Sequence, residues 1–361
     1  MERILCIKIA SRGDLLLAAP AFQLLRKTRS QAHLTLLVGV SCKDVALHLP
    51  YFDEIHSIDD RMLLAGSFGE KLGAAQHLLR EMKKRDFKNT SDSKVDTKAS
   101  FYSEIIIFHR DWRYSILAWL ARIPKRRGFY NRWSAFFLTH TYQPNDKEHH
   151  IYQYLGLLGQ TEIKDASLAG LWRFRKDEQD SALKKAEVHG FVPTGDRSIA
   201  LGFGGGRNVK THTELKRWPI ASYQRLAGQL SEKGFRVIWI GDKEDAELLG
   251  DSFIGINLTG KFSVPETAAI LNVCQLVVTN DTLHLHLAEI LGIPSLGLFG
   301  PTDPAHYRPL GARSAYLWIG EQLPCSPCHK DGYFPPCLYQ HRCMSELSVE
   351  SVLGKIEELL K

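Results

Sequence analysis

The sequence of 361 residues has no hydrophobic run long enough to cross a membrane, since none approaches the roughly 18 apolar residues that a spanning helix needs. Its N-terminal apolar stretch is too short for a secretory signal peptide and is not followed by a small-residue cleavage site. We therefore expect the protein to stay in the cytoplasm, with any membrane contact being peripheral.

Three familiar ligand-binding signatures are also missing. The phosphate loop G-x-x-x-x-G-K-[ST] is absent, which argues against a P-loop NTPase. No G-x-G-x-x-G opens a helix, which weakens the case for an NAD-dependent enzyme. No recognised nucleic-acid-binding motif occurs either, which argues against a nucleic-acid-binding module.

The net charge of +6 is unevenly distributed along the chain. Residues 1–165 hold 25 Lys and Arg against 18 Asp and Glu, whereas the remainder holds 21 against 22. A basic N-terminal half suggests an anionic partner bound there. Nucleic acid, anionic lipid and a phosphorylated glycolipid all satisfy that requirement.

The seven cysteines fall into two groups. Cys6, Cys42 and Cys274 stand alone among apolar residues, as buried structural thiols do. The other four lie within 19 residues of one another, at Cys325, Cys328, Cys337 and Cys343. Four thiols suit a structural zinc or iron site, and an equally good interpretation is a set of reduced thiols that pack a loop.

Strands and helices alternate in both halves of the chain. The pattern predicts a strand over 3–10, a turn over 11–14, a helix over 15–27 and a strand over 33–38, which together form a right-handed βαβ unit. The same alternation restarts at residue 198, and the polar segment 83–100 reads as a mobile loop.

We therefore predict an α/β protein with two Rossmann-like, doubly wound domains that face each other across a cleft. The predicted boundaries are 1–175 for the N-terminal domain, 176–345 for the C-terminal domain, and 346–361 for a terminal helix.

The first motif with chemical potential is Ser11-Arg12-Gly13-Asp14, at the carboxyl end of the first strand. Ligands of open α/β sheets bind at that edge. Asp14 would be placed there to accept a proton from a substrate hydroxyl, or it would simply cap the helix that follows.

Two further motifs favour phosphate binding. Gly204-Gly205-Gly206 leads through a polar loop to Lys216-Arg217-Trp218-Pro219, and glycines let backbone N–H groups approach a phosphate. The segment 279–288 (TNDTLHLHLA) runs from a strand into a helix. Asp281 or Thr282 would cap that helix and leave N–H groups for a diphosphate, with His286 one turn after Thr282 on the same helix face.

Together these motifs resemble the signatures of glycosyltransferase family 9, the heptosyltransferases of lipopolysaccharide synthesis. The N-terminal block resembles S-x-G-D-x-hydrophobic-x-x-x-P, and Lys216-Arg217-Trp218-Pro219 resembles the family's K-R-W-P loop. N-D-T-x-x-x-H-L-A, followed by Phe299-Gly300-Pro301-Thr302-Asp303-Pro304, resembles its C-terminal signature. The blocks appear in the family order, and the Cys-x-x-Cys tail is similar to that of many members.

The resemblance implies the GT-B architecture, with the acceptor on the N-terminal domain and a sugar nucleotide on the C-terminal domain. It implies inverting transfer of a heptose from ADP-heptose to the lipopolysaccharide inner core, with no cofactor required for catalysis. Asp14 would be the catalytic base. The donor-binding residues would be Gly205, Lys216, Glu244, Asp281, Thr282 and His286, with Asp242 as an alternative to Glu244 at the ribose.

Arg12, Lys125, Arg126 and Arg127 would meet the anionic acceptor. The basic stretch of residues 122–133 would equally suit a solvated face or contact with the anionic inner membrane leaflet. One departure from the family pattern is Leu283, which stands where members usually have glycine and would crowd the phosphates. Two alternatives therefore stay open: a member that uses another nucleotide sugar or acceptor, and a metal- or nucleic-acid-binding module.

Overall fold

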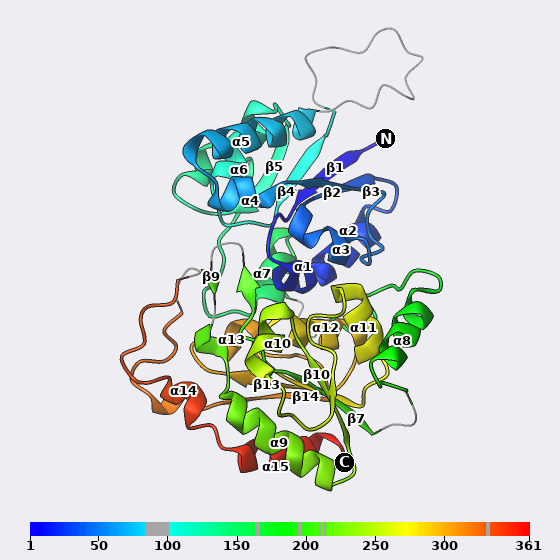
Figure 1. Cartoon of the computed structure of the whole chain (residues 1–361). Coiled ribbons are helices and arrows are strands. Elements are labelled where there is room, and N and C mark those ends of the chain that lie inside the picture. The colour runs from blue at the N-terminus through cyan, green and yellow to red at the C-terminus, as the bar shows by residue number, and fades with distance from the viewer. Residues whose placement is uncertain (84–100, 163–166, 194–196, 209–210, 213, 330–332) are drawn as a thin grey trace. The chain divides into compact units, whose positions relative to one another are not determined.

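The computed structural model of the chain describes residues 1–83, 101–162, 167–193, 197–208, 211–212, 214–329 and 333–361. The chain divides into two compact units, residues 1–166 and 167–361 (Figure 1). The unit boundary thus lies nine residues before the domain boundary expected from the sequence, and the terminal helix belongs to the second unit. Apart from Lys83, the segment expected to be a mobile loop lies outside the described residues.

The first unit is built on one parallel sheet. Its strands are β1 (Arg3–Ile7), β2 (His33–Gly39), β3 (Glu54–Ile58), β4 (Glu104–Ile107), β5 (Lys125–Phe129) and β6 (His140–Tyr142). They lie in the order β3-β2-β1-β4-β5-β6, and every neighbouring pair is parallel. This is the doubly wound order, in which ligands bind beyond the carboxyl ends of the strands.

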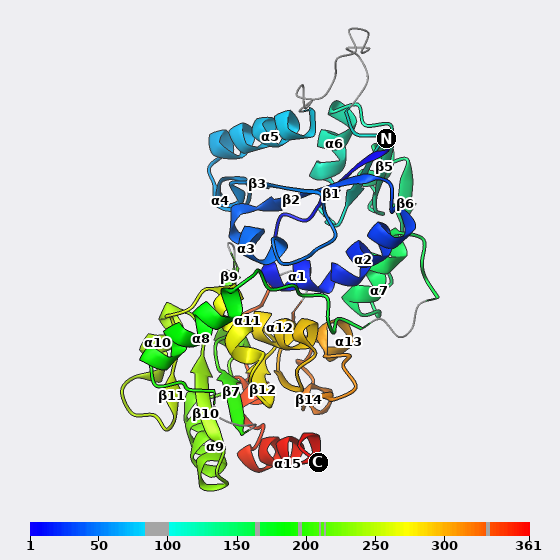
Figure 2. The same cartoon turned by 90° about the vertical axis from the view of Figure 1, so that its right-hand side faces the viewer.

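Helices cover both faces of this sheet. They are α1 (Arg12–Leu17), α2 (Ala19–Thr28), α3 (Lys43–Ala46), α4 (Asp60–Ala65), α5 (Phe68–Lys83), α6 (Arg113–Leu120) and α7 (His150–Leu157), with the 3-10 turns η1 (Val40–Cys42) and η3 (Ser134–Phe136). Figure 2 shows α5 and α6 on one face, and α1, α2, α3 and α7 on the other. Leu5, Ile7 and Ile105 point to the first face and form one core with α5 and α6.

The second unit repeats the architecture. Its sheet contains β7 (Ser198–Gly202), β10 (Arg236–Ile240), β11 (Ile256–Asn257), β12 (Leu276–Asn280), β13 (Ser295–Phe299) and β14 (Ser314–Trp318). They lie in the order β11-β10-β7-β12-β13-β14, all parallel, which is again the doubly wound order. A separate antiparallel hairpin joins β8 (Arg207–Asn208) to β9 (Thr211–His212).

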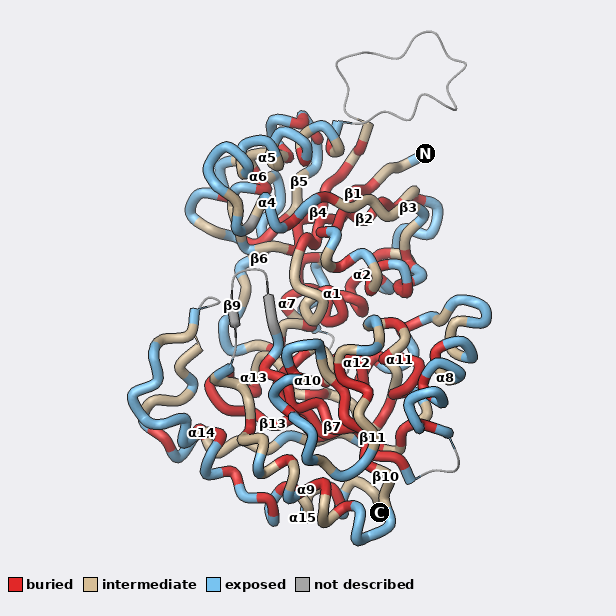
Figure 3. The backbone as a smooth tube through the Cα atoms, viewed as in Figure 1, coloured by how far each residue is buried: buried red, intermediate tan, exposed pale blue. Residues whose placement is uncertain are grey.

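The second sheet is also covered on both faces. The helices are α8 (Glu178–Val188), α9 (Ile220–Glu232), α10 (Lys243–Leu249), α11 (Val264–Leu271), α12 (Leu283–Leu291), α13 (Pro304–Tyr307), α14 (Arg342–Ser345) and α15 (Val349–Leu359), with the turns η4 (Glu214–Lys216) and η5 (Gly320–Gln322). The helices α9 and α15 pack together beneath β7, β10 and β14. The buried residues in Figure 3 concentrate along the central strands of each unit.

Two local predictions need correction. The segment 11–14 is not a turn, because Ser11 caps α1 and places Asp14 in the third helical position. The predicted single helix 15–27 is two helices, α1 and α2, since the helix is interrupted at Ala18, just before Pro20, which has no N–H to donate.

The strand β5 lies in the basic stretch of residues 122–133, where the sequence predicts no strand. The cations of this stretch mask the apolar pattern by which a strand is recognised.

Among the described residues, none of the helices combines the length and the apolar character needed to span a bilayer.

Candidate active site

Asp14 lies just beyond the carboxyl end of β1, at the sheet edge where ligands are expected. It completes a capping box with Ser11, whose N–H and hydroxyl donate to its Oδ2 at 3.4 and 3.2 Å. The Lys8 ammonium lies 3.5 Å from the same oxygen, and the Asp14 side chain is 32% exposed. Among the described residues, no hydrogen bond or ion pair uses Oδ1, so this oxygen can accept a proton from a bound hydroxyl.

A buried cation and a neutral histidine surround Asp14. Burial raises the pKa of Asp14, but Lys8, His150 and the Ser11 N–H outweigh it and hold that pKa well below its usual range. The Lys8 side chain is itself buried, and its Nζ donates to the Ala10 carbonyl at 2.7 Å. Burial lowers the pKa of His109 to about 3, and its Nε2 accepts from the Ile9 N–H at 2.7 Å. Asp14 is therefore ionised at neutral pH, next to a cation and an uncharged imidazole.

A small pocket opens beyond the ends of β4 and β5 in the same unit. Its lining consists of Ile107, His109, Arg110, Asp111, Trp112, Ser115, Gly128, Phe129, Ser134 and Leu138. His109 thus connects the Asp14 edge with this pocket. Sequence reasoning missed the pocket, because its walls come from separate segments that only the sheet order brings together.

The predicted acceptor-binding cations are not brought together. Arg12 lies on α1 and forms a two-point ion pair with Asp44, at 3.0 and 3.2 Å. Arg126 donates to the carbonyls of Ile123, Pro124 and Phe137.

The other two predicted cations lie on β5 with Arg126. Arg127 pairs with the buried Glu104 at 3.2 Å, and its guanidinium also donates to the Leu157 carbonyl. Lys125 is exposed at the start of β5, level with Glu104, whereas Asp14 lies beyond the carboxyl ends of the strands. Lys125 and Asp14 are therefore at opposite edges of the sheet.

In the second unit, the half-buried Lys216 forms an ion pair with the buried Asp281. The Lys216 Nζ lies 2.7 Å from Asp281 Oδ2 and 3.2 Å from the Asp281 carbonyl, and the Asp281 side chain is 3% exposed. The hydroxyl of Thr302 donates to the same carboxylate oxygen at 2.8 Å. Burial raises the pKa of Asp281, but Lys216 and His286 outweigh it and leave that pKa below its usual value. These contacts join three sequence motifs at one sheet edge.

Asn280 holds the surrounding loops in place. Its side-chain amide donates to the carbonyls of Phe203 and Gly204, and its Oδ1 accepts from the Trp218 N–H at 3.1 Å and from the Tyr223 hydroxyl. The glycine loop, the Lys216 segment and the end of β12 are therefore fixed to one side chain. Sequence reasoning did not assign this role to Asn280, although Asn280 stands inside the third motif.

The N-terminus of α12 suits an anion. Thr282 is its N-cap residue, but the Thr282 side chain makes no capping hydrogen bond, and its hydroxyl lies 3.2 Å from that of Thr279. The first N–H groups of a helix carry partial positive charge and attract phosphates. Leu283 is the first helical residue and is half-buried, while His286 is buried one turn further.

The loop after β10 and the start of α10 hold the two residues that were candidates for binding the ribose, Asp242 and Glu244. The Asp242 carboxylate caps α10 by accepting the N–H groups of Glu244 and Asp245, whereas the Glu244 side chain is exposed. Asp245 is buried beneath the glycine loop, and a Cβ on Gly204 would collide with its carboxylate. The neighbouring Gly205 is buried as well. Asp242 and Asp245 together form the capping box of α10.

The four clustered cysteines, Cys325, Cys328, Cys337 and Cys343, lie near the end of the second unit. Across the described ranges, no three His, Cys, Asp or Glu residues come together as a metal-binding group. Cys337 is exposed and accepts a hydrogen bond from the His341 N–H, while Cys343 packs against the core of the second unit. Cys325 and Cys328 are half-buried. The metal site and the set of reduced thiols that pack a loop therefore both stay predictions.

Glu289 on α12 is a buried acid that sequence reasoning overlooked. Its Oε1 accepts from the backbone N–H groups of Leu310 and Gly311, and burial raises its pKa to about 7 despite these donors. In the unfolded chain a glutamate ionises near pH 4.5, so the folded state binds more protons between about pH 4.5 and 7. The stability contribution of Glu289 is therefore greatest at low pH and falls as the pH rises through that window.

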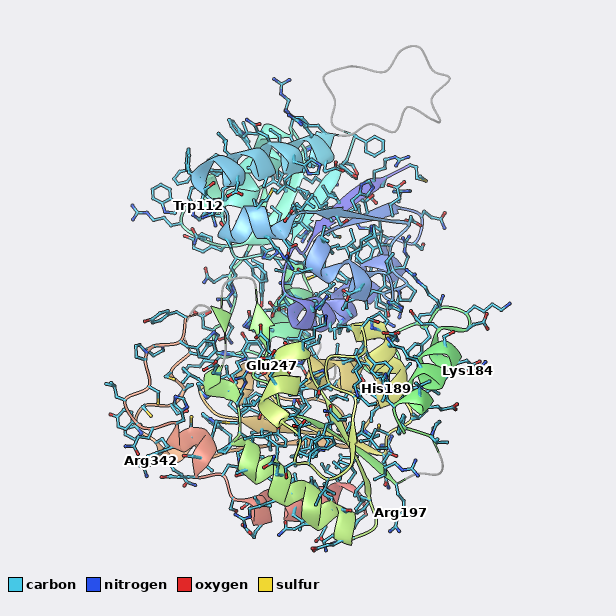
Figure 4. All side chains as sticks on the ribbon, in the orientation of Figure 1. Trp112, Lys184, His189, Arg197, Glu247 and Arg342 are labelled. Carbon is cyan, nitrogen blue, oxygen red and sulfur yellow. The ribbon has the colours of Figure 1, made fainter. Side chains whose placement is uncertain are left out.

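We expect Glu289→Gln to remove this fall, because Gln keeps the acceptor oxygen and cannot ionise. At pH 8 the variant should be more stable than wild type by an amount on the order of 3 kcal/mol, and near pH 4.5 the difference should vanish. Thermal unfolding across this pH range measures the effect. Glu247→Gln is the control, since Glu247 is exposed on α10 (Figure 4). Equal shifts at both pH values would contradict the assignment.

Comparison with known proteins agrees with the fold of the two units. The family model for glycosyltransferase family 9 (heptosyltransferase) matches residues 97–335. Lipooligosaccharide heptosyltransferase 2 of Haemophilus influenzae is 23% identical over 367 residues, which cover 96% of each chain. A solved glycosyl transferase family 9 structure from Veillonella parvula has a TM-score of 0.77, with 24% identity, 99% coverage of this chain and 97% of that one.

The solved E. coli ADP-heptose lps heptosyltransferase II has a TM-score of 0.72 and 18% identity, and covers 100% of this chain and 98% of its own. These likenesses confirm the predicted GT-B fold of two Rossmann-like domains. Since the family model spans more than half of the sequence, the chain belongs to glycosyltransferase family 9, the heptosyltransferase family, and is a glycosyltransferase.

Proposed function

We propose that this protein transfers a heptose from ADP-heptose to the inner core of lipopolysaccharide, with inversion at the anomeric carbon. The observation that carries the proposal is the N-terminus of α12, which the Thr282 side chain does not cap, beside the ion pair of Lys216 with the buried Asp281. A helix N-terminus and a cation together suit a diphosphate. The heptosyltransferase names of the similar proteins support the choice of sugar and acceptor.

The donor would bind to the second unit. Lys216 and the first N–H groups of α12 would hold the diphosphate, with Thr282 and Gly205 beside it. Asp281 would orient Lys216 through their ion pair, and His286 would lie behind the same loop. Glu244, whose side chain is exposed in the first turn of α10, would accept hydrogen bonds from the ribose hydroxyls.

The acceptor would bind to the first unit, with Asp14 as the catalytic base. Its Oδ1 would take the proton of the acceptor hydroxyl as that oxygen attacks the anomeric carbon and the bond to ADP breaks on the opposite face. The negative charge that develops on ADP would be stabilised by Lys216 and the α12 N–H groups, so these groups supply the stabilisation without a catalytic metal.

Among the cations predicted for the acceptor, Arg12 is the one on the Asp14 helix, so we assign it to the anionic groups of the core. The lipid part of such an acceptor would hold the enzyme against the cytoplasmic face of the inner membrane.

A panel of nucleotide sugars tests the donor. ADP-heptose and ADP should raise the melting temperature, with about 2.7 kcal/mol of stabilisation at a ligand concentration of about 100 times Kd. The panel includes UDP- and GDP-sugars, because Leu283 replaces the glycine usual in the family at the helix start. Stabilisation by UDP- or GDP-sugars alone would replace ADP-heptose as the donor, and stabilisation by NAD alone would overturn the proposed function.

A further inference from the structure

An exposed apolar surface runs along α6 and the η3 segment of the first unit. On α6 the residues Tyr114, Ser115 and Ala118 point into the core. The opposite stripe, at helical spacing, is apolar instead of polar. We define the α6–η3 surface by Trp112, Ile116, Trp119, Leu120, Trp133, Phe136 and Phe137. Phe136 is 76% exposed, Trp133 54% and Trp119 51%.

The aromatic residues of this surface pair with one another at both ends of α6. The rings of Trp112 and Trp133 lie 6.2 Å apart at one end of α6, and those of Trp119 and Phe137 lie 5.8 Å apart at the other. Trp112 lies at the outer side of the first unit (Figure 4). Contiguous exposed aromatics are rare on soluble monomers and mark sites of interaction.

The surface is rimmed by cations. Between residues 112 and 144 the sequence holds six Lys and Arg and no Asp or Glu, and these six charges equal the net charge of the whole chain. Arg113, Arg126 and Arg127 bond to groups within the unit.

The other three, Arg122, Lys125 and Arg132, are exposed and pair with no carboxylate of the described residues. Their charge is therefore available to an external partner.

We propose that the α6–η3 surface docks on the anionic headgroups of a lipid bilayer. Tryptophan and phenylalanine side chains gain free energy at the boundary between headgroups and acyl chains, and Lys and Arg are attracted to anionic lipid. Trp119, Trp133 and Phe136 would enter that boundary while the cations contact phosphates. Duplex nucleic acid would use the cations alone and leave the exposed aromatics without a role.

The α6–η3 surface lies next to the pocket near Asp14, so docking would bring a membrane-anchored acceptor close to the base. This step rests on the proposed function. Trp112 belongs both to this surface and to the pocket beyond β4 and β5, whose lining includes His109 beside Asp14. A sugar acceptor anchored in the bilayer would therefore be presented at the sheet edge that carries the base. Vesicle binding needs neither sugar nor nucleotide, so its failure is distinguishable from failure of the proposed transfer.

Sedimentation with vesicles of phosphatidylethanolamine and about 30% phosphatidylglycerol tests the docking. Wild type should bind at low salt, bind weakly to pure phosphatidylcholine, and dissociate as salt screens the charges. Trp133→Ser with Phe136→Ser should lower the partition coefficient by at least about tenfold. Lys125→Gln with Arg132→Gln should lower it by about 25-fold, since each cation contributes roughly fivefold.

Val188→Ser with Leu338→Ser is the matched control, because both residues are highly exposed apolar side chains of the second unit. This control should bind vesicles as wild type does, and all variants should keep the wild-type melting temperature. Wild type that stays in the supernatant, or an aromatic variant that still binds normally, would overturn the proposal. Equal affinity for duplex DNA would overturn it too, because the surface would then recognise polyanions in general.

Discussion

Asp14→Asn should lower kcat for sugar transfer by about 10²–10⁴-fold while leaving the affinity for ADP unchanged. The acceptor hydroxyl has a far higher pKa than a carboxylate, so Asp14 can take its proton only as the new bond forms. The amide keeps the size of the side chain and an oxygen that can accept the N–H and hydroxyl of Ser11 in the capping box. The measurement is turnover with ADP-heptose and a lipopolysaccharide core acceptor, beside an ADP titration.

The environment of Asp14 requires a second variant. The Asn side chain leaves the buried Lys8 ammonium without its counter-charge, so Asp14→Asn should also lower the melting temperature. Lys8→Met combined with Asp14→Asn removes both charges and should recover stability without recovering activity. Recovery of activity in the double variant would show that the loss came from misfolding and that Asp14 is no base.

Glu70→Gln provides the control for capping alone. Glu70 completes the same type of box with Ser67 at the start of α5, in the same unit as Asp14. Its substitution should leave kcat near the wild-type value. Near-normal turnover in Asp14→Asn as well would reduce Asp14 to a helix cap and point to another group as the base.

Lys216→Ala should weaken ADP binding by roughly 10- to 150-fold, which corresponds to about 1.5–3 kcal/mol for a charge-assisted contact. Calorimetric titration with ADP measures this loss. The same substitution leaves the Asp281 carboxylate buried without its cation, so it should also destabilise the fold by about 3–5 kcal/mol. Affinity and stability therefore have to be separated.

The double variant Lys216→Ala with Asp281→Asn separates them. It removes both charges and leaves the Thr302 hydroxyl with a neutral acceptor, so most of the stability should return. ADP affinity should stay low, because the cation that would contact the diphosphate is still missing. If affinity returned together with stability, Lys216 would be a structural partner of Asp281 and would not bind the donor.

The sequence by itself determined the class of fold and the order of the motifs. Alternating strand and helix patterns are local, since a buried parallel strand and an amphipathic helix differ over a few residues. The three motif blocks follow strand ends in the chain, and any doubly wound sheet brings its strand ends to one edge. For that reason the sequence alone predicts that Asp14, Lys216 and Asp281 lie near sheet edges.

Only the tertiary structure decided which charges meet. Lys216 and Asp281 are 65 residues apart in sequence, and their 2.7 Å contact depends on the order of the strands, which local periodicity does not specify. The same holds for Arg127, which the pairing of β4 with β5 places against Glu104. Hydrophobic patterning is a property of short segments, whereas a charge acquires its partner, and with it its pKa, only when the sheets assemble.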